Sequence, residues 1–256
     1  MPFDYTKPPM GVTKNIARYK DIRTLLKDSM SLQKELCVSN ACSKICVIFQ
    51  QCLSAIGVQS RLVYGIMEFN TLDIKIPHVW LVIQNEVVDN TYQHIAMKNE
   101  EVFLELLSES RYIEKDPAND PDVFLGDDFS RGHGISDHNI SITQWDVDNP
   151  DKSLAILQNA GHLRLYHERM RAIVLSKFHV TIPERPIVNE SCWTCGLNTS
   201  ELKTCSRCKV ARYCSQRCQK DGWKRLYKNI CIPPNDPRFY IDPENIANYT
   251  YDTTLY

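Results

Sequence analysis

Seven of the eleven cysteines lie between residues 192 and 231, and their spacing is that of zinc ligands. A Cys-x-x-Cys pair lets two thiolates reach one tetrahedral zinc ion, and two cysteines four residues apart on a helix share one face. A segment of roughly forty residues with few large apolar side chains cannot build a core alone, so a metal must contribute folding free energy. We therefore predict that zinc is bound by Cys192, Cys195, Cys205, Cys208, Cys214, Cys218 and Cys231.

The same segment resembles the MYND zinc finger in an ordered set of residues. The matching residues are Cys192-Trp193-Thr194-Cys195, Cys205-Ser206-Arg207-Cys208, Tyr213-Cys214-Ser215, Cys218-Gln219-Lys220, Trp223 and Cys231. The resemblance implies two zinc ions in interleaved order: the first is held by Cys192, Cys195, Cys214 and Cys218, and the second in part by Cys205, Cys208 and Cys231. It also implies a module for protein interaction, because several members of the family bind proline-containing peptides.

The segment departs from the family pattern at one zinc ligand. Where the family has a His four residues before its last Cys, this chain has Tyr227, and one additional residue, which we assign to Gly222, precedes it. A neutral phenol is a poor zinc ligand, because tyrosine ionises near pH ~10. Three arrangements of the second site are open: three cysteines with a water, a fourth ligand from His162 or His167, or no metal.

A second group of residues has the types needed for nucleophilic catalysis. Cys42 lies in the first turn of an expected helix, where the helix dipole favours the reactive thiolate. His78 opens one expected strand and Asp89 closes the next, so antiparallel pairing would bring the two side chains together. Asp89 would then orient the imidazole that takes the thiol proton, with Cys46 a rival nucleophile on the same helix face.

Each of these residues also has an ordinary structural explanation. Cysteine is among the most frequently buried residue types, and three other cysteines, at positions 37, 46 and 52, lie close to Cys42 in the sequence. A single His at a strand edge is more often structural than catalytic, and Asp89 before Asn-Thr could form a turn. Residue types and spacing alone therefore leave a non-catalytic interpretation open.

The ordered set between residues 38 and 93 resembles the transglutaminase-like cysteine enzyme superfamily. The counterparts are Cys42, Ala55-Ile56-Gly57 with Arg61, His78-Val79-Trp80 and Asp89-Asn90-Thr91. The resemblance implies that Cys42 rather than Cys46 is the nucleophile, and that a papain-like helix bearing Cys42 packs on a sheet bearing His78 and Asp89. It further implies acyl transfer or amide hydrolysis through a thioester.

Two departures from that superfamily keep a second interpretation open. Asn40 stands where the family commonly has a Gly two residues before the nucleophile, and the interval from His78 to Asp89 is short. The alternative is a non-catalytic adaptor, in which the transglutaminase-like domain is degenerate and the finger does the binding. Whether the chain is an enzyme thus depends on whether the Cys42 thiol is activated.

The elements that must position these residues predict an α+β fold. Helical apolar spacing covers residues 14–36, and a second, buried helix follows an N-cap pair at Ser39-Asn40 and stops at Gly57. Short β-branched and aromatic runs at 61–67, 78–83 and 86–89 predict an antiparallel sheet. Residues 99–152 are expected to form an acidic excursion, and residues 151–176 one further helix. We divide the chain into a transglutaminase-like domain at 1–183, a finger at 190–231 and an extended tail at 232–256.

The near-neutral charge of the chain conceals two opposed regions. The 256 residues carry a net charge of −1, yet residues 99–152 hold fourteen Asp and Glu against four Lys and Arg, and residues 190–231 hold nine Lys and Arg against three Asp and Glu. Bulk charge therefore excludes a general nucleic-acid or membrane-surface binder, and no apolar run approaches the ~18 residues of a membrane span. An odd cysteine count and a polar start predict the cytoplasm or nucleus, with a protein partner.

Overall fold

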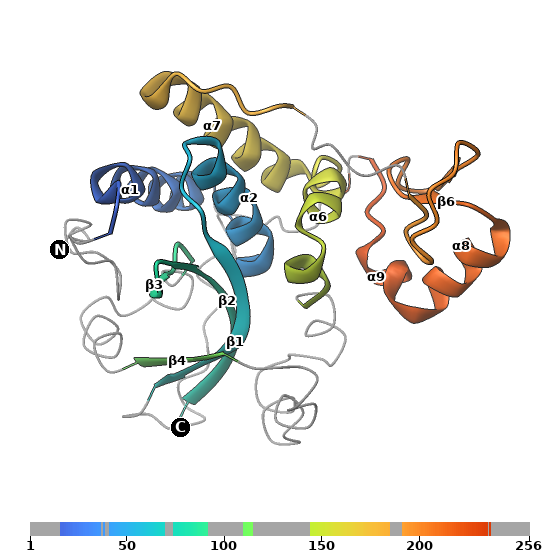
Figure 1. The fold of residues 1–256 in the computed structure, drawn as a ribbon, viewed down its shortest axis with the longest axis horizontal. Coiled ribbons are helices and arrows are strands. Elements are labelled where there is room, and N and C mark those ends of the chain that lie inside the picture. The colour runs from blue at the N-terminus through green and yellow to red at the C-terminus, as the bar shows by residue number, and fades with distance from the viewer. Residues whose placement is uncertain are drawn as a thin grey trace.

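The structure, a computed structural model, describes residues 16–36, 38, 41–69, 74–91, 110–114, 144–184, 191–234 and 236. A helix-and-sheet region occupies one side of the molecule and the cysteine-rich segment forms a smaller body beside it (Figure 1). The described part of the chain is thus a mixed α and β protein, in agreement with the expected fold class. None of its helices is both long and apolar enough to cross a membrane.

A four-stranded antiparallel sheet carries the middle of the chain. It contains β1 (Arg61–Phe69), β2 (Ile74–Ile83), β3 (Glu86–Val88) and β4 (Ser110–Glu114) in the order β3-β2-β1-β4. The sheet is curved, and helix α2 lies beside β1 and β2 (Figure 1). A two-residue turn with positive φ at Gln84 (49°) and Asn85 (67°) joins β2 to β3, as a twisted hairpin requires. The three predicted strands are therefore confirmed. However, β2 begins four residues before His78, which lies inside the strand rather than at its start.

Helix α2 (Cys42–Ala55) packs against β1, β2, α6 (Pro150–Leu157) and α7 (Gly161–Phe178). Its nearly continuous apolar sequence explains why it is buried. Its end is a Schellman motif: Gly57 (φ 79°) donates to the Ser54 carbonyl at 2.9 Å, and Val58 donates to the Leu53 carbonyl at 2.9 Å. The predicted stop at Gly57 is confirmed. The predicted N-cap is wrong, because the cap position is Ala41, whose methyl side chain makes no capping hydrogen bond.

Helices α1 (Tyr19–Glu35) and α7 (Gly161–Phe178) pack against each other, and α7 also packs on α2. The apolar spacing that predicts α1 is confirmed by burial of Ile22, Leu25, Leu26 and Met30 on one face. A polar network crosses this layer, in which the Ser29 and Tyr166 hydroxyls lie 2.7 Å apart. The layer therefore holds α2 from the side opposite the sheet.

The prediction of one continuous helix over residues 151–176 is wrong, because the structure has two helices there, α6 (Pro150–Leu157) and α7. The apolar period continues across the break, so periodicity alone does not detect it. Asn159 and Gly161 are weak helix formers, and the Asn159 side-chain amide donates to the carbonyls of Cys208 (2.9 Å) and Ile232 (2.8 Å). Contacts with the finger therefore stabilise the break.

The finger contains the short hairpin β5 (Lys203–Thr204) and β6 (Arg212–Tyr213), helix α8 (Gln216–Gly222), the π-helix η3 (Trp223–Tyr227) and α9 (Lys228–Ile230). Its buried side chains belong to the same apolar cluster as the helix-and-sheet core. Several predicted features lie outside the described residues, namely Cys37, most of the acidic excursion, the segment around Pro186 and the tail beyond residue 236. Strand β4 and a helix at 144–148 fall within the predicted excursion, which is therefore partly structural.

Gly65 in β1 gives a test of how closely the sheet is packed. A Cβ added there would lie 2.3 Å from the Ile113 carbonyl oxygen in β4 and 2.4 Å from the Trp80 ring in β2. We expect Gly65→Ala to lower the free energy of unfolding by about 2 kcal/mol, since a backbone atom must move to admit the methyl group. Urea denaturation measures this change.

The matched control is Gly161→Ala at the start of α7, where the nearest atom, the Asp236 carbonyl oxygen, is 4.0 Å away. Alanine is a better helix former than glycine, so this variant should be neutral or more stable. Equal stability of Gly65→Ala and the wild type would show that β4 does not approach β1 as described.

Candidate functional site

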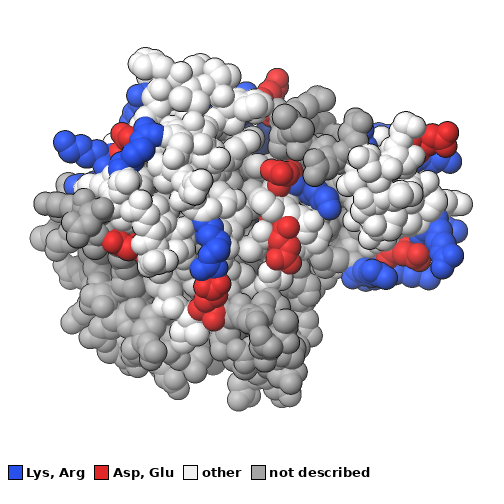
Figure 2. Space-filling view, viewed as in Figure 1, with Lys and Arg blue, Asp and Glu red and all other residues white. Residues whose placement is uncertain are grey.

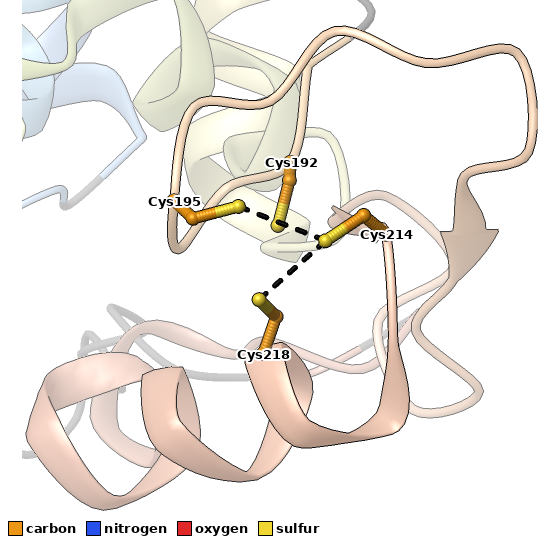
Figure 3. Close-up of side chains that lie close together, drawn as sticks. All are labelled: Cys192, Cys195, Cys214 and Cys218. Atoms are coloured by element: carbon orange, nitrogen blue, oxygen red, sulfur yellow. Dashed lines mark hydrogen bonds between the residues drawn. The ribbon is translucent and has the colours of Figure 1, made fainter.

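Four cysteines of the finger converge on one point (Figure 3). Cys192 and Cys195 come from a loop, Cys214 follows β6 and Cys218 lies on α8. The Cys214 sulfur lies 3.6 Å from that of Cys195 and 3.5 Å from that of Cys218, and all four sulfurs lie within 4.8 Å of one another. Four sulfurs bound to tetrahedral zinc at ~2.3 Å are separated by ~3.8 Å, so this group fits the ion.

The local backbone conformation places the four cysteines of this first group near one another. Gly196 has φ 74° and donates to the Cys192 carbonyl at 2.8 Å, which closes the turn that presents both loop cysteines. Ser215 caps α8 by accepting from the Cys218 backbone N–H at 3.1 Å, so Cys214 and Cys218 lie on either side of the helix start. Close thiolates repel one another, and a divalent cation offsets that repulsion.

A second group contains Cys205, Cys208 and Cys231, all buried and with sulfurs within 4.8 Å of one another. The Cys205 and Cys231 sulfurs are 4.0 Å apart, and the Cys208 sulfur accepts from the Val210 and Ala211 backbone N–H groups at 3.4 Å. Backbone donors of this kind stabilise a metal-bound thiolate. Three ligands of a second zinc site are therefore brought together.

The Tyr227 hydroxyl lies beside this second group, 2.7 Å from the Cys208 sulfur. The ring reaches this position from the last residue of η3, the π-helix that follows Gly222. A π-helical turn accommodates one extra residue in a helix, which explains how the longer segment still directs Tyr227 inward. The expectation that His162 or His167 supplies the ligand is wrong. His162 is bound to the Leu36 carbonyl (3.3 Å) and His167 to the Gln51 side chain (2.7 Å).

In the helix-and-sheet region, His78 and Asp89 meet as expected. The His78 Nε2 atom lies 2.7 Å from the Asp89 carboxylate, and both side chains are buried. Asp89 also accepts from the Thr91 backbone N–H (2.8 Å), the Thr91 hydroxyl (3.0 Å) and the Tyr112 hydroxyl (2.9 Å). Burial raises the pKa of Asp89, but His78 and these donors outweigh it, so the pKa lies below its usual value.

Cys42 is the first residue of α2, is partly exposed and contacts His78. Burial lowers the pKa of His78, but the charge and hydrogen bond of Asp89, followed by those of Cys42, raise it from 6.5 to about 10. The imidazole is thus held as a cation near neutral pH, beside the thiol and the carboxylate. The three side chains form a contiguous Cys-His-Asp arrangement.

The other described cysteines of α2 are placed differently. The Cys46 thiol is buried and donates to the Val79 carbonyl and the Asn90 side-chain oxygen, each at 3.3 Å. Burial, followed by the charge of Asp89, raises the pKa of Cys46 well above its usual range. Burial raises the pKa of Cys52 to about 12. Neither thiol is therefore arranged to react, and the geometry favours Cys42.

Sequence reasoning missed two residues of this site. Tyr112 comes from β4, inside the segment expected to be an excursion. This five-residue strand lacks a regular alternation of apolar and polar side chains, so it has little sequence signal. Asn90 appears in the predicted motif only as a neighbour of Asp89, yet it accepts from Cys46 and its amide donates to the Ser29 hydroxyl at 3.0 Å. Both contacts join segments distant in the sequence, so only the fold reveals them.

The spacing and convergence of the seven finger cysteines define a zinc-binding module that holds zinc in two groups of ligands. Residues 192–231 match the MYND finger family, a zinc-binding module of protein interaction. The segment is thus a MYND finger, and the family match covers this part of the chain.

Curated relatives resemble the chain over short stretches. Protein CBFA2T2 of Homo sapiens is 43% identical over 49 residues, which are 19% of this chain and 8% of that protein. Histone-lysine N-methyltransferase SMYD1 of Homo sapiens is 44% identical over 45 residues, 18% of this chain and 9% of that protein. Ubiquitin carboxyl-terminal hydrolase 15 of Arabidopsis thaliana is 41% identical over 78 residues, 28% of this chain and 8% of that protein.

The chain therefore spans less than a tenth of the length of these relatives. Two of the three names describe an activity, and those two activities differ. No solved structure matches the chain. The comparisons thus identify the finger, while the role of the helix-and-sheet region has to be argued from its own residues.

Tyr227 gives a direct test of the second metal site. We expect wild-type protein to contain between one and two zinc ions per chain, and Tyr227→His to bring the content to two, because imidazole is a far better zinc ligand than a neutral phenol. Plasma emission analysis of protein dialysed against a weak chelator measures the content. Tyr213→His, a change in the neighbouring buried tyrosine, is the control and should not add zinc. Unchanged zinc content in Tyr227→His would contradict this assignment of the fourth position.

Proposed function

We propose that the helix-and-sheet region is a cysteine-dependent acyl-transfer or amide-hydrolysing domain of the transglutaminase-like type, with Cys42 as nucleophile, His78 as general base and acid, and Asp89 as the residue that orients His78. The observation that carries the proposal is the buried His78–Asp89 contact of 2.7 Å with Cys42 against the same imidazole. A helix that begins at a cysteine and packs on an antiparallel sheet bearing the other two residues supports it.

The surroundings of Cys42 fit the reaction. Helix α2 has no acidic residue in its first turn, and the methyl group of Ala41 cannot accept a hydrogen bond from the N–H groups there. These N–H groups favour negative charge, both on the thiolate and on the oxygen of a tetrahedral intermediate. The imidazolium of His78, with its pKa of about 10, supplies the balancing positive charge.

The chemical steps follow from these roles. The Cys42 sulfur bonds to the acyl carbon of an amide, the carbon–nitrogen bond breaks, and His78 delivers to the departing amine the proton that came from the thiol. Water or a second amine then attacks the thioester, His78 accepts the proton of that attacker, and the thiol is restored as the acid or new amide leaves. Asp89 holds the imidazole through both steps.

The finger would serve this domain by binding a protein partner. We propose that its ligand is a proline-containing peptide, since aromatic side chains are suited to dock the preformed extended conformation of proline. The finger holds the rings of Trp193 and Trp223 each against Tyr227. Lys and Arg side chains gather along the lower edge of the finger in Figure 2. Among the basic residues of the finger, the Arg217 side chain is 92% exposed. These charges would accelerate association with an acidic partner. We also propose that the chain divides into a transglutaminase-like domain at 1–183, a finger at 190–231 and a tail at 232–256. We propose further that the protein acts in the cytoplasm or nucleus.

The test of the catalytic site is the reactivity of the Cys42 thiol. Treated with iodoacetamide at pH 6 and analysed residue by residue by mass spectrometry, Cys42 should react at least about tenfold faster than N-acetylcysteine amide, because only an activated thiolate is abundant at that pH. His78→Gln should abolish the advantage, and His162→Gln, which alters a histidine bound to Leu36, should keep it. A Cys42 rate no higher than that of the small thiol would favour the adaptor alternative.

The ligand class of the finger is tested separately. A proline-containing peptide should bind the zinc-loaded protein at least about tenfold more tightly than the same peptide with alanine at the proline positions, as calorimetry can measure, since only proline is preformed in the extended conformation. Removal of zinc should abolish binding, because the metal sustains the finger. Equal affinity for both peptides would reject proline as the recognised feature.

A further inference from the structure

We propose that Asp146 is a positioning residue for Cys42, and that the MYND finger holds Asp146 in place through Trp193. The inference rests on the proposed role of Cys42 and assigns to the finger a second task, which is to support the start of the nucleophile-bearing helix. It is carried by a continuous series of contacts that joins α2, the 144–148 helix, α6 and the finger.

The first link is the Asp146 carboxylate, which is fully buried. One of its oxygens accepts from the Ser43 hydroxyl at 2.7 Å, and the other accepts from the Ser153 hydroxyl on α6 at 2.8 Å. The buried Lys44 ammonium pairs with the same carboxylate and donates to the Ser153 hydroxyl at 3.3 Å. Asp146 therefore ties two residues of α2 to α6.

The two tied residues, Ser43 and Lys44, follow Cys42 directly in the first turn of α2. A helix start frays when no side chain caps it, and Ala41 cannot act as a cap. The contacts with Asp146 hold this turn through the Ser43 and Lys44 side chains rather than through its backbone N–H groups. Rotation or fraying of this turn would move the Cys42 sulfur away from His78, whose ring is fixed by Asp89.

The second link joins Asp146 to the finger. Its neighbour Trp145 lies against Trp193, with ring centroids 6.3 Å apart, and the Lys152 ammonium of α6 lies 5.7 Å from the Trp193 ring centre. Trp145 also faces the Lys44 ammonium, 6.0 Å from its ring centre. Trp145 thus contacts the finger through Trp193 and contacts Lys44, the partner of Asp146, as well.

The third link is the first zinc group. Trp193 lies between the ligands Cys192 and Cys195, and its backbone N–H donates to the Arg212 carbonyl at 2.9 Å. Zinc bound by the two cysteines fixes the loop and with it the Trp193 ring. Loss of the ion releases that loop, and the support of Trp145 is lost with it.

A purely stabilising role for the ion pair is the competing explanation. Buried ion pairs contribute little more than apolar side chains of the same volume, whereas their hydrogen bonds fix the orientation of the groups they join. A substitution of Ser43 distinguishes the positioning role from the stabilising role. It removes one hydrogen bond to Asp146 but leaves the Lys44–Asp146 ion pair intact, so no buried charge is left unpaired. Its position beside Cys42 makes the reactivity of that thiol the appropriate measurement.

The first experiment measures the alkylation rate of Cys42 from pH 5 to pH 9 in Ser43→Ala and in Ser54→Ala. Ser54 is an exposed residue at the other end of α2, so it is the matched control. We expect Ser43→Ala to lower the rate at pH 6 about fivefold, the factor that corresponds to one ordinary hydrogen bond, and to move the rate–pH curve to higher pH. Ser54→Ala should retain the wild-type curve.

The second experiment examines the finger. Trp193→Ala should lower the Cys42 rate at pH 6 at least about threefold, as expected when an aromatic contact is lost, and Trp193→Phe should restore most of it. Leu197→Ala is the control, because Leu197 is a finger residue whose side chain is exposed. Zinc analysis of each variant verifies that the finger is still loaded. Removal of zinc from the wild type should lower the rate, and its return should restore it.

The outcomes separate this inference from the proposed function. A fast Cys42 that is unaffected by Ser43→Ala, Trp193→Ala and zinc removal would overturn the positioning role and leave the catalytic proposal standing. A slow Cys42 in the wild type would overturn both. Equal losses in Trp193→Ala and Leu197→Ala, with zinc retained, would show a general effect of the finger and overturn the route through Trp145.

Discussion

The burial of helix α2 is the constraint on which the rest of the structure depends. The helix is enclosed by β1 and β2 on one side and by α6 and α7 on others, yet its first residue, Cys42, stays partly exposed. Its two ends are fixed by different means. The C-terminal end is closed locally by the Schellman motif at Gly57, whereas the N-terminal end has no cap of its own and depends on Asp146, a residue a hundred positions away.

The sheet and the helix contribute complementary parts of one site. Strand β2 supplies His78, the end of β3 supplies Asp89, and β4 supplies the Tyr112 hydroxyl that holds the carboxylate. Because Asp89 accepts from Thr91 and Tyr112 as well as contacting His78, its charge is maintained in a buried setting where an isolated carboxylate would be strongly destabilised. The imidazole is in turn kept protonated beside Cys42. The pairing of the strands thus brings His78, Asp89 and Tyr112 together, and their charges and hydrogen bonds set the protonation state of the site.

The finger is both a metal-dependent unit and a packing partner. Its two ligand groups differ, since the first contains four cysteines and the second contains three with the Tyr227 hydroxyl alongside. Metal binding compensates for the small apolar content of this segment. Asn159 and Trp193 join it to the break between α6 and α7 and to Trp145, so its buried residues continue the core of the larger region.

The sequence by itself determined the features that depend on local spacing: the zinc ligands, the buried helix with its glycine stop, the strands and the pairing of His78 with Asp89. Cysteine spacing and apolar period are properties of neighbouring residues, so they can be read without a fold. Only the tertiary structure decided that Ala41 rather than Ser39-Asn40 precedes α2, that the helix expected at 151–176 breaks at Asn159, and that Tyr112 and Asp146 enter the core. These features depend on contacts with residues distant in the chain. Such contacts can override local helix propensity, and they leave no pattern in the neighbouring sequence from which they could be predicted.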